Sequence, residues 1–140
     1  MIVVDASLVV KLFRQEPNSD LAEQTYAEYR GQVAAPDLLA VEVTSALVRN
    51  ANMAKPTRPY IEIALAEFRQ VLRDETIFFH RLSAQQLAVA AQHALDLGHP
   101  IKDCIYLALA MELGCDLVTC DARFAAKAKG VWAGVRVLGA

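Results

Sequence analysis

The sequence of 140 residues has little of what marks several protein classes. Six glycines, five prolines and no repeat exclude a collagen-like chain and oppose a disordered one. Its three cysteines, Cys104, Cys115 and Cys120, lack CxxC spacing, so we expect reduced thiols in a core. No apolar run approaches the roughly 18 residues of a membrane span, and Asp5 interrupts the apolar start before a signal-peptide core. We therefore expect a cytoplasmic protein without a membrane partner.

An excess of positive charge is also missing. Lysine and arginine total 14 against 16 acids, a formal net charge of −2, which excludes a generally basic protein that coats nucleic acid. A local basic rim is still compatible with this balance. The chain does have apolar residues, at 55%, and this length and composition suit one compact domain with a core. We expect a single domain over residues 1–140.

Five short apolar runs predict the strands of a parallel sheet. They cover residues 2–4, 33–35, 76–79, 116–119 and 135–138. They do not alternate apolar with polar residues, as half-exposed strands do, and burial on both faces is typical of parallel strands joined by helical crossovers. The order of strands and helical stretches predicts a three-layer α/β/α sandwich with a central five-stranded parallel sheet.

Capping residues mark the helices between these runs. We expect helices over residues 21–29, 38–48 and 57–72. Ser83 can cap a further helix that Gly98 ends, and the helix opened by His99-Pro100 ends at Gly114. Residues 105–111 of that last helix, IYLALAM, are apolar all round, which predicts a central helix packed against the sheet.

Two acids follow predicted strands directly. Asp5 ends the first strand and Asp121 follows the fourth, at the carboxyl edge where open α/β sheets place their ligand crevice. Helix capping explains either acid alone. If the strand order reverses beside the first strand, the first and fourth strands are neighbours and the two acids meet.

Two further acids stand in apolar helices. Glu42 lies inside LLAVEVTSAL, where an ionised carboxylate needs a compensating partner, for which Arg49 on the same helix face is the structural alternative. Asp103 stands in the first turn of the central helix, whose positive end stabilises its charge even without a ligand. Both helices can bring these acids to the same edge of the sheet.

Four carboxylates in one place favour a bound cation. Two carboxylates about 4 Å apart repel by roughly 4 kcal/mol at an effective dielectric of 20. Mg²⁺ or Mn²⁺ prefers such oxygen ligands, and the hydroxyls of Ser7 and Thr119 can orient them. Acids that hold a hard cation are suited to phosphoryl chemistry on a phosphodiester. Basic residues that could grip its backbone, or be ordinary surface charges, are Lys11, Arg14, Arg49 and Arg81.

Four motifs occur in order along the chain: MIVVDAS, VEVTSAL, IKDCIYLALA and LVTCDARF. Together they resemble the PIN domain, and most closely the short VapC-type toxins of prokaryotic toxin–antitoxin pairs. The resemblance covers essentially the whole chain. It departs at Cys104, where members commonly carry a small residue such as Ala, and a thiol packs similarly.

This resemblance implies the family's acidic quartet, which binds Mg²⁺ or Mn²⁺, at Asp5, Glu42, Asp103 and Asp121, with Ser7 and Thr119 at its hydroxyl positions. It implies a Mg²⁺-dependent endoribonuclease that hydrolyses RNA by a metal-activated water and leaves 5′-phosphate and 3′-hydroxyl ends. A homodimer silenced by a cognate antitoxin protein is implied as well. The alternative is a non-catalytic PIN-fold module that binds metal or a partner.

Other acidic or metal-binding classes fit less well. A phosphoacceptor receiver domain needs an acid after the third strand and a lysine after the fifth, where this chain has FFH and LGA. A haloacid-dehalogenase-like phosphatase needs an acid where Ser7 stands. A zinc module lacks close ligand pairs among Cys115, Cys120, His93 and His99, which we interpret as core cysteines and surface histidines.

A further apolar stretch, residues 60–68, has helical spacing. Core packing explains it, and the family resemblance suggests a groove for an antitoxin segment there as the alternative.

Overall fold

The computed structural model describes all 140 residues and contains a five-stranded parallel sheet. Its strands are β1 (Ile2–Val4), β2 (Val33–Pro36), β3 (Phe78–His80), β4 (Asp116–Thr119) and β5 (Val135–Val137). They lie in the order β3-β2-β1-β4-β5, and every neighbouring pair is parallel. The predicted sheet is confirmed, and its order reverses beside β1, as a crevice at the end of that strand requires.

Strand boundaries differ from the sequence-based expectation mainly at β3. The expected run began at Thr76, whereas the strand begins at Phe78 and extends to His80. Ile77 lies just before the strand and is buried, so its apolar side chain contributes to the core although the residue is not part of β3. The apolar run predicted a strand buried on both faces. Because β3 is an edge strand, Phe78 is instead 47% exposed.

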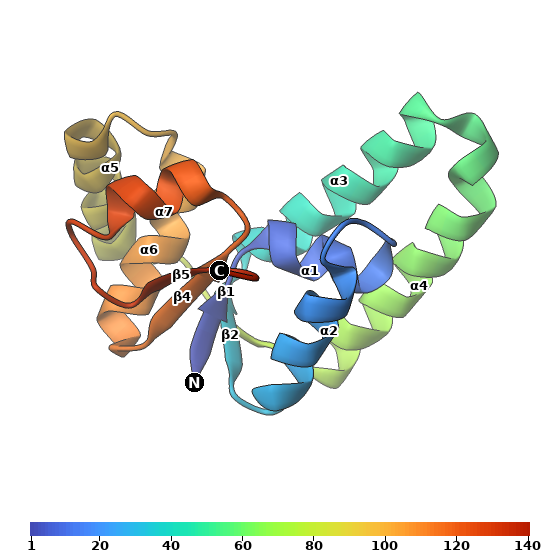
Figure 1. Ribbon diagram of the computed structural model, residues 1–140, viewed down its shortest axis with the longest axis horizontal. Helices are drawn as coiled ribbons and strands as arrows, with labels where there is room; N and C mark the ends of the chain where they lie inside the picture. The colour runs from blue at the N-terminus through green and yellow to red at the C-terminus, as the bar shows by residue number, and fades with distance from the viewer.

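Helices cover both faces of the sheet. They are α1 (Ala6–Phe13), α2 (Ser19–Glu28), α3 (Leu38–Met53), α4 (Arg58–Asp74), α5 (Ala84–Leu97), α6 (Ile101–Leu113) and α7 (Ala122–Ala128), with a 3₁₀ turn, η1 (Lys55–Thr57). Figure 1 shows α5, α6 and α7 on one side of the strands and α1 to α4 on the other, which confirms the three-layer sandwich. No helix combines the length and apolarity that crossing a membrane requires.

Helix α6 is the central helix that the sequence predicts. Residues 104–110 are all buried, and the helix packs against β1, β2, β4 and α5. Gly114 ends it in the left-handed conformation, at φ +65°, where a glycine carries no Cβ strain. This fixed helix places Asp103, in its first turn, near the carboxyl ends of β1 and β4.

The cysteines are free, as expected. Cys104 is fully buried, and burial together with the negative charge of Asp103 raises the pKa of its thiol to about 11. Burial also raises the pKa values of Cys115 and Cys120, which are only partly covered. All three thiols are therefore predominantly protonated near neutral pH.

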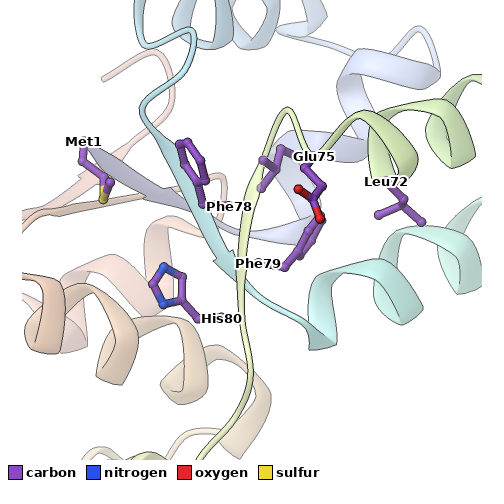
Figure 2. Close-up of a pocket in the computed structure, with 7 residues that line it drawn as sticks. Met1, Leu72, Glu75, Phe78, Phe79 and His80 are labelled. Carbon is purple, nitrogen blue, oxygen red and sulfur yellow. The ribbon is translucent and has the colours of Figure 1, made fainter.

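Two features lie away from the carboxyl edge of β1. Figure 1 shows α3 and α4 as a long hairpin that extends away from the sheet. Figure 2 shows a hollow along edge strand β3, lined by Met1, Leu72, Glu75, Ile77, Phe78, Phe79 and His80. None of the four acids singled out in the sequence lines this hollow.

Candidate metal centre

Asp5 is held at the end of β1 by hydrogen bonds to both carboxylate oxygens. Its Oδ1 accepts from the Ser7 hydroxyl at 2.5 Å and from the Leu8 backbone N–H at 3.2 Å. Its Oδ2 accepts from the Thr119 hydroxyl. The residue is 7% exposed and also caps α1, so the capping role expected from the sequence and a fixed orientation are present together.

Thr119 connects the ends of β1 and β4. Its hydroxyl donates to Asp5 and accepts from the backbone N–H of Asp121 at 3.1 Å. Asp121 caps α7 through a bond from the Phe124 N–H to its Oδ1 at 3.0 Å, and its residue is exposed. The two strand-end acids are therefore linked through a single buried side chain.

Asp103 lies with His99 and Asp121 in a compact group. One ligand atom from each of these three residues lies within 4.8 Å of the other two. His99 Nε2 is 2.6 Å from Asp103 Oδ2. Burial raises the pKa of Asp5, and the negative charge of Asp103 acts in the same direction. Asp103 therefore lies with Asp121 and close enough to Asp5 for its charge to act there, whereas Asp5 and Glu42 do not belong to the three-residue group.

Glu42 is hydrogen-bonded to Tyr106, which the sequence analysis assigned only to the buried part of the central helix. The Tyr106 hydroxyl donates to Glu42 Oε1 at 2.5 Å. Glu42 is partly buried, as expected, but its partner is this tyrosine, and Arg49 forms no ion pair with it. The available signal was the spacing, because Tyr106 lies one turn after Asp103 and a buried tyrosine needs a hydrogen-bond partner.

The pKa shifts show how costly these charges are. Burial raises the pKa of Asp5, and hydrogen bonds from Ser7, Thr119 and the Leu8 backbone offset only part of that effect. Burial, the bond to Glu42 and the charges of Glu42, Asp5 and Asp103 raise the pKa of Tyr106 far above its usual value. Its hydroxyl therefore stays protonated and remains a donor to Glu42.

The charges of the site fit a divalent cation. No lysine or arginine forms an ion pair with any of the four acids, and their only such partner is His99. Carboxylate oxygens are the ligands that Mg²⁺ and Mn²⁺ prefer, and a cation would favour the ionised form of Asp5 against the effect of burial. The donor set therefore suits the metal that the sequence suggested.

The remaining sequence-based candidates lie elsewhere or have other partners. Lys11 and Arg14 both form ion pairs with Glu16. Lys11 Nζ is 3.8 Å from Glu16 Oε1, and Arg14 Nη1 is 2.9 Å from Glu16 Oε2. Arg49 and Arg81 are exposed and form no ion pair. The interpretation of His99 as a surface residue is wrong, because only 10% of its side chain is exposed and it joins the two acids.

Comparison with known proteins identifies the family of the chain. The sequence model of the PIN domain matches residues 2–130. The chain belongs to the PIN domain family. A search of curated proteins gives no match.

Solved structures share the fold of this PIN domain at low sequence identity. PAE2754 from Pyrobaculum aerophilum is 22% identical with a TM-score of 0.63, over 98% of this chain and 90% of that one. A toxin–antitoxin complex from Klebsiella pneumoniae is 18% identical, with a TM-score of 0.65 over 96% and 95%. VapC20 of Mycobacterium tuberculosis, a sarcin–ricin loop cleaving toxin, is 16% identical, with a TM-score of 0.65 over 90% and 94%.

Proposed function

We propose that this PIN domain is a Mg²⁺- or Mn²⁺-dependent endoribonuclease and the toxin of a type II toxin–antitoxin pair. The observation that carries the proposal is the link from Asp5 through Thr119 to Asp121, with Asp103 beside both acids. The resemblance of the motifs to VapC-type toxins points the same way, as does the fold shared with a toxin–antitoxin complex and an RNA-cleaving toxin.

The residues have separable tasks in this reaction. Asp5, Asp103, Asp121 and Glu42 would hold the cation, which on binding stabilises negative charge on the reacting phosphate and promotes attack by water. Ser7 and Thr119 fix the direction of the Asp5 oxygens, and Tyr106 fixes Glu42. Arg49 and Arg81, which have no acidic partner, are free to contact the RNA backbone.

Cleavage of RNA tests the activity. Purified protein incubated with total cellular RNA and Mg²⁺ should produce new ends that carry 5′-phosphate and 3′-hydroxyl groups, and EDTA should stop it. Asp5→Asn, with an unchanged circular-dichroism spectrum, is the matched control. RNA left intact by the wild type with either cation, while it still binds metal, would favour the alternative of a non-catalytic binding module.

The α3–α4 hairpin is the proposed antitoxin surface. Ile61 and Phe68 face the core, whereas Tyr60 and Ile63 of the same helix are 75% and 59% exposed. One face of this helix therefore packs in the core, and its other face is exposed and is the one that we propose binds an antitoxin segment. Val41, Val48 and Met53 add exposed apolar area on α3.

Pull-down with the product of the adjacent gene tests this surface. Ile63→Asp should abolish capture and leave folding unchanged, since Ile63 lies outside the core. Glu67→Gln, at an exposed position of the same helix, is the control. Undiminished capture by Ile63→Asp contradicts the proposed surface. We also propose that the chain forms a homodimer, which sedimentation of the purified protein tests. The proposed RNA substrate suits a cytoplasmic location, which cell fractionation tests.

A further inference from the structure

His99 stands outside the motifs that carry the family resemblance, in the turn just before α6. Its imidazole Nε2 lies 2.6 Å from Asp103 Oδ2, and a ring nitrogen of His99 belongs with Asp103 and Asp121 to one group of ligand atoms within 4.8 Å. It supplies the only nitrogen among the potential ligand atoms of that group. Lys127, on α7, donates to the Gly98 carbonyl at 3.2 Å.

The imidazole is held firmly in place. Gly98 ends α5 in the left-handed conformation at φ +61°, and the His99 backbone N–H donates to the Ala94 carbonyl at 3.1 Å. The following Pro100 restricts the backbone of His99 further. The ring packs on Phe124 with centroids 4.7 Å apart, and its side chain is 10% exposed. Its direction is therefore set before any ligand arrives.

The same packing couples His99 to Asp121. Phe124, on which the imidazole lies, donates its backbone N–H to Asp121 Oδ1 at 3.0 Å. The histidine and both acids thus belong to one connected corner between α6 and α7. Donors bound to one cation at about 2.1 Å lie no more than about 4.2 Å apart, so small side-chain rotations suffice to bring all three onto it.

We propose that His99 is a nitrogen ligand of the metal centre and makes it favour Mn²⁺ over Mg²⁺. If Nε2 is the ligand, its bond to the cation replaces the hydrogen bond to Asp103, and the neutral imidazole keeps its one proton on Nδ1. Mg²⁺ selects oxygen ligands, whereas imidazole binds transition metals well, so one nitrogen in an otherwise carboxylate site strengthens Mn²⁺ binding preferentially. This inference rests on the proposed function in one respect, because both place a cation at the same site. Binding of the cation is measurable without RNA, which separates the two.

Calorimetric titration of the metal-free protein with Mn²⁺ and, separately, with Mg²⁺ tests the preference. We expect His99→Gln to weaken Mn²⁺ binding about tenfold and to change Mg²⁺ binding less than about twofold. Glutamine keeps a polar group that can donate to Asp103 but offers a much poorer ligand for Mn²⁺. His93→Gln, on α5 and outside the ligand group, is the matched control and should change neither affinity.

Pulsed electron paramagnetic resonance of the Mn²⁺-loaded protein gives a second, structural readout. A ¹⁴N modulation from a directly bound imidazole should appear in the wild type and in His93→Gln and vanish in His99→Gln. An equal loss of both metals, or no loss of either, in a folded His99→Gln overturns the inference and leaves the proposed nuclease standing. A wild type that binds neither metal overturns both.

Discussion

The acidic site has two halves that are built in different ways. The inner half is Asp5 with Ser7 and Thr119. Asp5 and Thr119 lie at strand ends and Ser7 in the first turn of α1, and each carboxylate oxygen of Asp5 accepts at least one hydrogen bond. In the outer half, Asp103 is 35% exposed and Asp121 lies on the surface. A buried and fully bonded carboxylate cannot move to suit a ligand, whereas an exposed one can. The inner half therefore sets the position of the cation and the outer half adapts to it.

The two halves also differ in what they cost the fold. Asp5 is buried, with a raised pKa, so its charge destabilises the protein when no cation is present. Asp121 carries its charge in water at the start of a helix, where the charge is favourable. A costly buried charge beside an inexpensive exposed one is typical of a site in which the buried group is retained for function.

The largest expected difference between the halves is in the metal affinity and RNA cleavage that remain after one carboxylate of each half is neutralised. Asp5→Asn should lower Mg²⁺ affinity and RNA cleavage at least about 100-fold, more than the loss usual for residues outside the ligand sphere. Asp121→Asn, whose side chain is exposed and still caps α7, should cost about tenfold by the same scale. Metal titration and cleavage rates measure both. Equal losses would break the distinction between the halves.

The next largest effect concerns Thr119, whose hydroxyl links Asp5 to the backbone of Asp121. Thr119→Val removes the donor to Asp5 and the acceptor for the Asp121 N–H, both in a fully buried position. We expect a loss of about 1–3 kcal/mol in the free energy of unfolding and of about 10- to 100-fold in metal affinity. Urea unfolding and metal titration measure these. Thr119→Ser keeps the hydroxyl and should restore most of the affinity.

A smaller effect should follow from the support of Glu42. Tyr106→Phe keeps the buried ring and removes only the hydroxyl that donates to Glu42. The free energy of unfolding should fall by about 0.5–1.5 kcal/mol, with a weaker effect on metal affinity than Thr119→Val. Tyr60→Phe, in an exposed position, is the control. Stability and metal affinity both at the wild-type level would show that Glu42 does not depend on Tyr106.

The smallest effect is the pH dependence of the metal-free protein. Burial raises the pKa of Asp5 in the folded protein above the 3.8 that is usual for an aspartate, so the folded state binds this proton more tightly than the unfolded state. The contribution of Asp5 to stability is therefore fully present below pH 3.8 and is lost as the pH rises through the folded pKa.

Thermal unfolding in EDTA measures this dependence. The melting temperature of the wild type, relative to that of Asp5→Asn, should fall as the pH rises from 3.8 through the folded pKa of Asp5, and an excess of Mg²⁺ should reverse the loss. A wild type that gains stability over Asp5→Asn across the same range in EDTA would contradict the raised pKa.

The inner half could be predicted from the sequence because it follows from strand ends. Asp5 directly follows an apolar run, and the neighbouring placement of β1 and β4 brings it to Thr119 and Asp121. The apolar run 105–111 likewise predicted a buried α6. Both patterns are local, and parallel strands leave few alternative arrangements.

The side-chain partners of Asp103 and Glu42 could not be predicted in the same way. His99 lies in a turn whose sequence, Gly-His-Pro, marks a helix boundary and says nothing about where the ring points. Its position depends on packing against Phe124, a residue 25 positions away. The bond from Tyr106 to Glu42 also joins two helices far apart in the sequence. Such contacts between distant side chains leave no periodicity in the chain.

Anomalous diffraction from crystals grown with Mn²⁺ tests the central claim most directly. The account predicts a strong peak at the carboxyl ends of β1 and β4, coordinated by carboxylate oxygens of Asp5 and Asp103. Ordered carboxylates with no peak between them, at Mn²⁺ concentrations that saturate the protein in solution, would contradict it.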